Sequence, residues 1–123
     1  MELGAFSISL NVKNIEKSLK FYERLGFEKL GGDISEKWLI LRNAKHQIGL
    51  FEGMLTQNTM TFNPGWDQLT NSLENFDDIK NIREKLLKNG IVPEFCPNGY
   101  KAEESHLMLS DPDGNMILID QHC

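Results

Sequence analysis

The most constraining feature of the sequence is an internal repeat, in which the second half follows the pattern of the first. The segment IEKSLKFYERLGF (15–27) matches IKNIREKLLKNGI (79–91) at an offset of 64 residues. Two apolar pairs of segments, WLILRN with QIGLF and HLMLSD with MILID, match at offsets of 68 and 69. The sequence therefore predicts two copies of one strand-helix-strands unit, each helix ending at a glycine.

Length and composition narrow the class of protein further. A chain of 123 residues suits one domain with a real core, and its net charge of −5 argues against a nucleic-acid partner. Its apolar runs are far shorter than the ~18 residues of a membrane span, and its start does not resemble a signal peptide. Cys96 and Cys123 lack zinc-ligand spacing. We therefore expect a cytoplasmic protein with free thiols that binds neither nucleic acid nor membrane.

The first half predicts a strand, a helix and three further strands. Residues 6–12 alternate between apolar and polar side chains, which indicates a strand with one face against a helix. Asn14 is a suitable N-cap for the helix that follows, and Gly26 ends that helix. Three strands are then predicted over residues 27–31, 36–42 and 46–52.

The second half predicts a similar order. A strand is predicted over 66–73, and Asp77 or Asp78 caps a helix that begins at Ile79 and ends at Gly90. Strands are predicted over 91–96, 104–110 and 115–121, with Asp111 to Gly114 as a type I turn between the last two. The expected organisation is a single domain, 1–123, with module one at about 5–53, a connection at 54–65 and module two at about 66–122.

Two stretches carry a resemblance to a known family. The opening ISLNVKNIEKSLKFYERLGF (8–27) and the closing LSDPDGNMILID (109–120), together with the duplication, resemble the vicinal oxygen chelate superfamily. That group includes glyoxalase I, bleomycin-resistance proteins and extradiol dioxygenases. The resemblance implies an α+β fold in which two βαβββ modules form a curved mixed sheet around a cleft, and a homodimer. Because one fold hosts many chemistries, the site requires its own argument.

The resemblance also implies where a metal would be held. Metal-using members take ligands from the first and last strand of each module. Matched onto this sequence, these four positions are Ser7, Gly49, Gln68 and Leu118. None offers the imidazole, thiolate or carboxylate of a metal site, so we expect neither a metal nor another cofactor. Asp120 and His106 leave a displaced metal site open, although surface or supporting roles are more common for such residues.

Strand alternation predicts what the cleft contains instead. An aromatic and aliphatic pocket with a few neutral hydrogen-bonding groups is typical of small-molecule sites. The candidate ligand-binding residues are Ser7, Asn11, Gly49, Phe51, Trp66, Gln68, Thr70, Met116 and Leu118. The alternatives are core packing for Trp66 and Phe51, solvent exposure for Ser7 and Asn11, and a bulge at Gly49. No catalytic residue is identified.

Two functions follow from these observations. The favoured one is a metal-independent protein of the glyoxalase/bleomycin-resistance type that binds a small organic molecule. The alternative is a glyoxalase-like isomerase or lyase, or a dioxygenase, with displaced metal ligands. Such enzymes need a cation to stabilise the charge that develops on vicinal oxygens, so the metal content of the purified protein separates the two functions.

Overall fold

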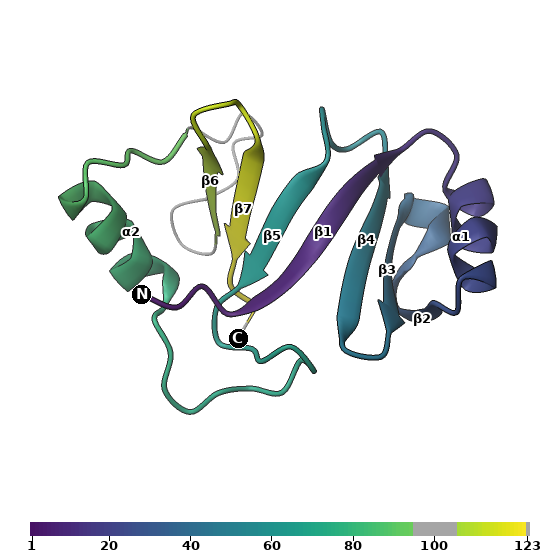
Figure 1. The fold of residues 1–123 in the computed structure, drawn as a ribbon, viewed down its shortest axis with the longest axis horizontal. Helices are drawn as coiled ribbons and strands as arrows, with labels where there is room; N and C mark the ends of the chain where they lie inside the picture. The colour runs from purple at the N-terminus through teal and green to yellow at the C-terminus, as the bar shows by residue number, and fades with distance from the viewer. Residues whose placement is uncertain (95–105, 123) are drawn as a thin grey trace. The chain divides into compact units, whose positions relative to one another are not determined.

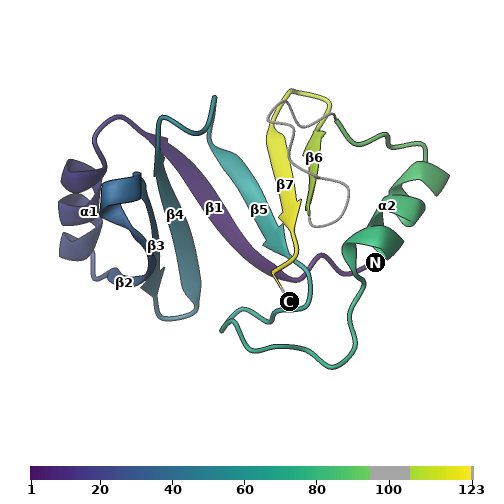
Figure 2. The ribbon, with the colours of Figure 1, turned by 180° about the vertical axis from the view of Figure 1, so that it is seen from behind.

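The protein has an α+β fold that divides into two compact units. The computed structural model describes residues 1–94 and 106–122, which contain two α-helices, one 3₁₀ helix and seven strands (Figure 1, and from behind in Figure 2). Ser7–Thr59 form the N-terminal unit. Met1–Phe6 and Met60–Cys123 form the C-terminal unit.

The N-terminal unit contains the predicted strand, helix and three further strands. Its elements are β1 (Ala5–Val12, whose first two residues belong to the C-terminal unit), α1 (Ile15–Arg24), β2 (Glu28–Asp33), the 3₁₀ helix η1 (Ile34–Glu36), β3 (Trp38–Asn43) and β4 (His46–Glu52). The strand order is β2-β3-β4-β1, with β1 parallel to β4 and the other pairs antiparallel. Asn14 caps α1 as predicted, because its side chain accepts the N–H of Lys17.

One face of the N-terminal sheet packs against α1 and forms the core of this unit. The buried cluster consists of Ile15, Leu39, Leu41, Ile48 and Leu50. Ile8, Leu10 and Val12 of β1 pack against the same cluster. This arrangement confirms the predicted alternation, which places the serines of β1 on the opposite face of the sheet.

The C-terminal unit repeats the plan with a second helix and core. Its elements are β5 (Thr59–Asn63, which begins at the last residue of the N-terminal unit), α2 (Ile79–Lys88), β6 (His106–Ser110) and β7 (Met116–Asp120). The strand order is β5-β7-β6. Helix α2 packs its buried stripe, Ile79, Ile82 and Leu86, against apolar side chains of β6 and β7.

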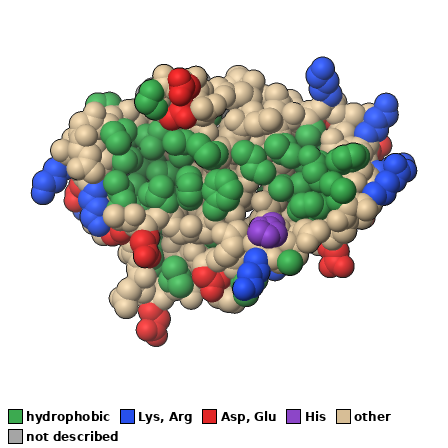
Figure 3. Space-filling view, viewed as in Figure 1, with side chains coloured by type: hydrophobic (Ala, Val, Ile, Leu, Met, Phe, Trp, Pro, Cys, Tyr) green, Lys and Arg blue, Asp and Glu red, His purple; other side chains and the backbone are tan. Residues whose placement is uncertain are grey.

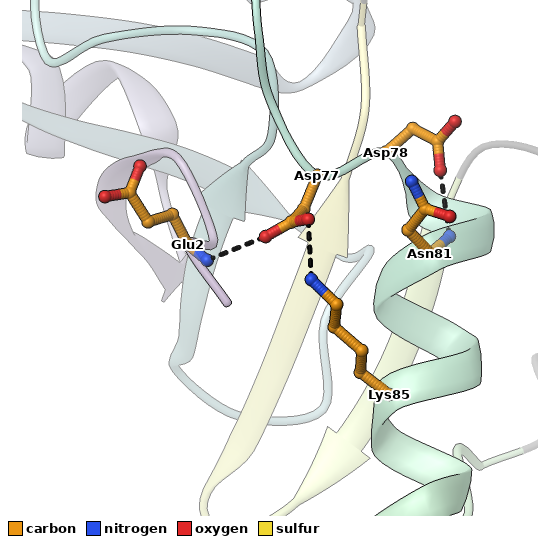
Figure 4. Close-up of polar contacts among 5 residues, drawn as sticks. All are labelled: Glu2, Asp77, Asp78, Asn81 and Lys85. Atoms are coloured by element: carbon orange, nitrogen blue, oxygen red, sulfur yellow. Dashed lines mark hydrogen bonds and ion pairs between the residues drawn. The ribbon is translucent and has the colours of Figure 1, made fainter.

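Two neighbouring acids fix the start of α2 (Figure 4). Asp78 is the N-cap, and its carboxylate accepts the N–H of Asn81 at 2.8 Å. Asp77 accepts the Glu2 N–H at 3.1 Å and pairs with Lys85 Nζ at 2.8 Å. Lys85, followed by the Glu2 N–H, lowers the pKa of Asp77. The sequence left the choice between Asp77 and Asp78 open, and the structure assigns the cap to Asp78.

A hydrogen bond at the same place in each unit confirms the internal repeat. In the N-terminal unit, the N–H of Ile15 donates to Glu52 Oε1 at 2.9 Å. In the C-terminal unit, the N–H of Ile79 donates to Gln121 Oε1 at 2.8 Å. The helix starts are separated by the predicted offset of 64 residues, and the two acceptors by the predicted 69. Each module therefore uses the end of its last strand to cap its own helix.

The strand predicted over 66–73 is wrong. The strand that leads to the second helix is β5, which lies within the segment predicted as a connection. Residues 66–72 instead form a short turn closed by a bridge between Trp66 and Ser72. Of the strand predicted over 91–96, Glu94 forms one bridge to Met108, whereas residues 95 and 96 lie outside the described part of the chain. Cys123 also lies outside it.

The turn at 67–71 has the same hydrogen bonds as the turn at 111–115. In both, the first aspartate accepts the N–H groups two and four residues later and the side-chain amide of an asparagine. The N–H of Asn71 lowers the pKa of Asp67, and the side-chain amide of Asn115 lowers the pKa of Asp111. The fourth position has a positive φ in both turns, 62° at Thr70 and 85° at Gly114.

Thr70→Gly is expected to stabilise the protein. A β-branched residue in the left-handed region costs about 1–2 kcal/mol, part of which is offset by the larger entropy that glycine loses on folding. We expect the free energy of unfolding to rise by about 0.5–1 kcal/mol in urea denaturation. The reciprocal change in the turn at 111–115, Gly114→Thr, should lower the free energy of unfolding. A lower free energy of unfolding in Thr70→Gly would contradict the backbone strain assigned to Thr70.

Candidate functional site

The face of the N-terminal sheet opposite α1 carries four of the nine residues predicted for the site, Ser7, Asn11, Gly49 and Phe51. Strand pairing places Ser9 beside Gly49, and both Asn11 and Trp38 beside Phe51. Paired residues in adjacent strands project on the same side of a sheet. We call this surface the aromatic face, and it consists of Ser7, Ser9, Asn11, Trp38, Ile40, Gly49 and Phe51.

Two aromatic rings lie nearly parallel on this face. The ring centroids of Trp38 and Phe51 are 6.5 Å apart, with an angle of 9° between the ring planes. Both side chains are partly buried. A parallel arrangement of this kind, with the rings offset, is a favourable aromatic contact. More generally, Figure 3 shows hydrophobic side chains at the surface of the molecule.

Neutral hydrogen-bonding groups lie beside the rings. Ser7 and Ser9 are buried, whereas the side chain of Asn11 is exposed. The backbone N–H of Asn11 donates to Asn58 Oδ1 at 2.9 Å, which holds this end of β1. The centre of the aromatic face is therefore uncharged. Arg42, two residues beyond Ile40 on β3, brings a partly buried positive charge to one end of the same face.

The predicted site residues of the C-terminal unit fall into two groups. Met116 and Leu118 lie on β7, on the side away from the core residue Ile119. Trp66, Gln68 and Thr70 lie in the turn at 66–72 rather than on a strand. Gln68 has a structural contact there: its side-chain amide accepts the Phe6 N–H at 2.9 Å and donates to the Phe6 carbonyl at 2.6 Å.

Trp66 belongs to a cluster with His122 and Asp120. The indole and imidazole rings are stacked, with centroids 5.1 Å apart and 14° between their planes. His122 Nε2 lies 3.1 Å from Asp120 Oδ2. The hydrogen bond to Asp120 raises the pKa of His122, because it favours the protonated ring, and partial burial opposes this shift. His106 on β6 is the cross-strand neighbour of Asp120.

Replacing Asp120 with asparagine is expected to lower the pKa of His122. Because the folded-state pKa is raised above the ordinary value of 6.5, the ion pair stabilises fully below that value and is lost as the pH rises through the folded-state pKa. A histidine NMR titration should show a midpoint above 6.5 in the parent protein and a lower midpoint in Asp120→Asn. An unchanged midpoint in the variant would contradict the ion pair.

The residues at the expected metal positions do not fit a metal ion. The pattern SISLN (7–11) of β1 matches TMTFN (59–63) of β5, so the third position moves from Gln68 to Thr59. Thr59 is buried and its hydroxyl donates to the Gln57 carbonyl at 3.1 Å. The corrected set therefore offers two hydroxyls, a glycine and a leucine, which do not provide the anionic or imidazole donors that divalent metals require.

A displaced metal site is not found among the described residues either. Within residues 1–94 and 106–122, no group of three or more His, Cys, Asp or Glu side chains is arranged to hold a metal ion. His106, Asp120 and His122 lie near one another, but His122 is engaged by Trp66 and Asp120.

The fold and its repeat define a class, and comparison with known proteins gives the family. The class is an α+β protein with two related strand-helix-strands modules. In each module, a side chain at the end of the last strand accepts the first N–H of the helix. The model of the Glyoxalase/Bleomycin resistance protein/Dioxygenase superfamily matches residues 4–119. The chain belongs to this superfamily, which confirms the resemblance drawn from residues 8–27 and 109–120.

Solved structures share the fold at low sequence identity. A glyoxalase/bleomycin resistance protein/dioxygenase superfamily member from Vibrio splendidus 12B01 is 17% identical, with 95% of this chain and 97% of that chain covered and a TM-score of 0.64. A protein described as NAD-dependent benzaldehyde dehydrogenase from Legionella pneumophila is 14% identical, with 96% and 99% covered and a TM-score of 0.68. An uncharacterized protein from Methanosarcina mazei is 15% identical, with 100% and 95% covered and a TM-score of 0.54. No curated protein matched the chain. These likenesses show the fold alone.

Trp38 and Ile40 are residues of the aromatic face that the sequence analysis did not identify. The segment WLILRN was predicted as a strand, but only the residues of the first and last strands of each module were considered for the site. The signal was present in the same alternation: Leu39 and Leu41 are buried against α1, so Trp38 and Ile40 project from the other face.

Proposed function

We propose that the chain is a metal-independent binding protein for a small organic molecule, which docks on the aromatic face. The observation that carries the proposal is the nearly parallel pair of rings, Trp38 and Phe51, on a face where strand pairing also places Ser9 and Asn11. Small-molecule sites commonly combine an apolar aromatic surface with a few polar groups that fix the orientation of the ligand. Membership of a superfamily with bleomycin-resistance proteins is consistent with this function.

The donor set supports binding without a cation. At the four positions where metal-using relatives would place ligands, this chain has Ser7, Gly49, Thr59 and Leu118. A hydroxyl is a weak neutral ligand, and glycine and leucine have no donor atom in their side chains, so a cation would lose its hydration without compensation. An apolar ligand has no comparable loss of hydration, because the burial of its apolar surface is favourable in free energy.

A thermal-shift screen of small organic compounds in the presence of EDTA tests the proposal. A ligand at 100 times its Kd adds about 2.7 kcal/mol to the free energy of unfolding, which is readily detected. We expect planar aromatic compounds to stabilise the protein with and without EDTA. The proposal would be overturned if no compound stabilised the protein, or if stabilisation disappeared with EDTA and returned on adding Zn²⁺, Ni²⁺, Mn²⁺ or Fe²⁺.

Oligomeric state and location stay predictions. A homodimer is implied by the resemblance, and light scattering with size-exclusion chromatography measures it directly. Cytoplasmic residence is expected from the sequence. Across the described residues, neither helix has the length and apolarity needed to cross a bilayer.

A further inference from the structure

Gly49 lies beneath the ring of Phe51, two residues further along the same strand. A Cβ atom built on Gly49 would lie 2.6 Å from Phe51 Cε2 and 3.4 Å from Phe51 Cζ. Heavy atoms do not approach a Cβ at 2.6 Å, so any side chain at position 49 would displace the ring. In a strand, residues two apart project from the same face, and only the absence of a side chain at 49 lets the ring fold back over the backbone.

The position of this ring matters for the aromatic face. Phe51 is the cross-strand partner of Trp38, and the two ring planes differ by 9°. A ring turned away from Gly49 would no longer lie parallel to the indole. The space above Gly49 is also where a ligating side chain at position 49 would have to begin, and Phe51 occupies it.

We propose that Gly49 is a positioning residue for Phe51, and that this pair replaces a potential ligating side chain with an apolar surface. The inference rests on the proposed function, because it concerns the same face. It deepens that function by naming the residue that sets the arrangement of the two rings. It also explains in steric terms why an acid or imidazole at position 49 is incompatible with the ring of Phe51.

A double-mutant cycle with Gly49→Ala and Phe51→Ala tests the proposal by urea unfolding. In the parent background, Gly49→Ala should raise the unfolding equilibrium constant by about tenfold, because overpacking forces the ring to move. In the Phe51→Ala background the same change should have little effect, because the ring is gone. Gly31→Ala is the matched control, since an added Cβ at that strand glycine meets no atom within 4 Å.

Ring proton chemical shifts supply a readout that overall stability does not affect. In Gly49→Ala, the aromatic protons of Phe51 and Trp38 should shift because the rings are no longer parallel, while Gly31→Ala should leave them unchanged. The proposal would be overturned if Gly49→Ala had the same cost in both backgrounds, or if the ring shifts did not move. These measurements use no ligand, so their outcome is independent of whether the protein binds a small molecule.

Discussion

Leu50→Ala is expected to lower the free energy of unfolding by about 2–5 kcal/mol. Leu50 is fully buried at the centre of β4, among Ile15, Leu39, Leu41 and Ile48. Removing its side chain loses the transfer free energy of the deleted atoms and leaves a cavity that the sheet and α1 cannot close. Urea denaturation measures the effect. A total stability of only about 5–15 kcal/mol is typical of a domain, so this is a large fraction of it.

Leu25→Ala is the matched control, because Leu25 is 57% exposed at the end of α1. The same chemical change there should alter stability by less than about 0.5 kcal/mol. A small effect of Leu50→Ala, equal to that of the control, would contradict the described core.

Ile82→Ala, in the core of the C-terminal unit, adds a test of the predicted single domain. If both core variants lower one common transition, the two units unfold together.

Trp38→Ala is expected to weaken binding of a ligand identified by the screen by at least about tenfold. The indole supplies a large apolar surface and one of the two parallel rings. Isothermal titration calorimetry in EDTA measures Kd for a planar compound that stabilises the parent protein. Unchanged affinity in Trp38→Ala would place the ligand elsewhere.

Phe21→Ala is the control for the loss of an aromatic side chain. Phe21 is 56% exposed on α1, which packs against the other face of the N-terminal sheet. Its replacement should leave Kd unchanged within about twofold. Equal losses of affinity in Trp38→Ala and Phe21→Ala would indicate a general effect on the fold, and the aromatic face would lose its main support.

Local patterns predicted the helices and most strands because their determinants are local. Asn14 and Gly26 define the ends of the first helix region, and the alternation of β1 separates its buried and polar faces. The repeat predicted that both modules share a plan, and the equivalent contacts of Glu52 and Gln121 confirm it. These signals lie within a few residues or recur at a fixed offset, so one sequence suffices to find them.

The first strand of the second module was predicted in the wrong segment. Residues 59–63 alternate between polar and apolar side chains, whereas residues 66–72 do not, and turn chemistry excludes a strand there. Asp67 accepts N–H groups from Leu69 and Asn71, which bends the chain into a turn. Thr70 then takes a left-handed conformation that a threonine rarely adopts, so the residue at this position does not indicate a turn. The likeness of SISLN to TMTFN was the signal for β5.

The candidate site was predicted only in part for a related reason. The polar face of β1 and the positions of Gly49 and Phe51 follow from alternation, and the structure places them together. Alternation also puts Trp38 on this face, but its position beside Phe51 depends on hydrogen bonds between segments separated in sequence. Trp66 and Gln68 were assigned to the strand predicted over 66–73, and this assignment is wrong because these residues form a turn.

The most direct test of the central claim is the metal content of the protein, measured by inductively coupled plasma mass spectrometry after purification without chelators and exhaustive dialysis. We expect far less than one equivalent of any transition metal per chain, and an unchanged Kd for the screened ligand after EDTA treatment. Near-stoichiometric zinc, nickel, manganese or iron, with ligand binding that is lost in EDTA and restored by that metal, would contradict the account.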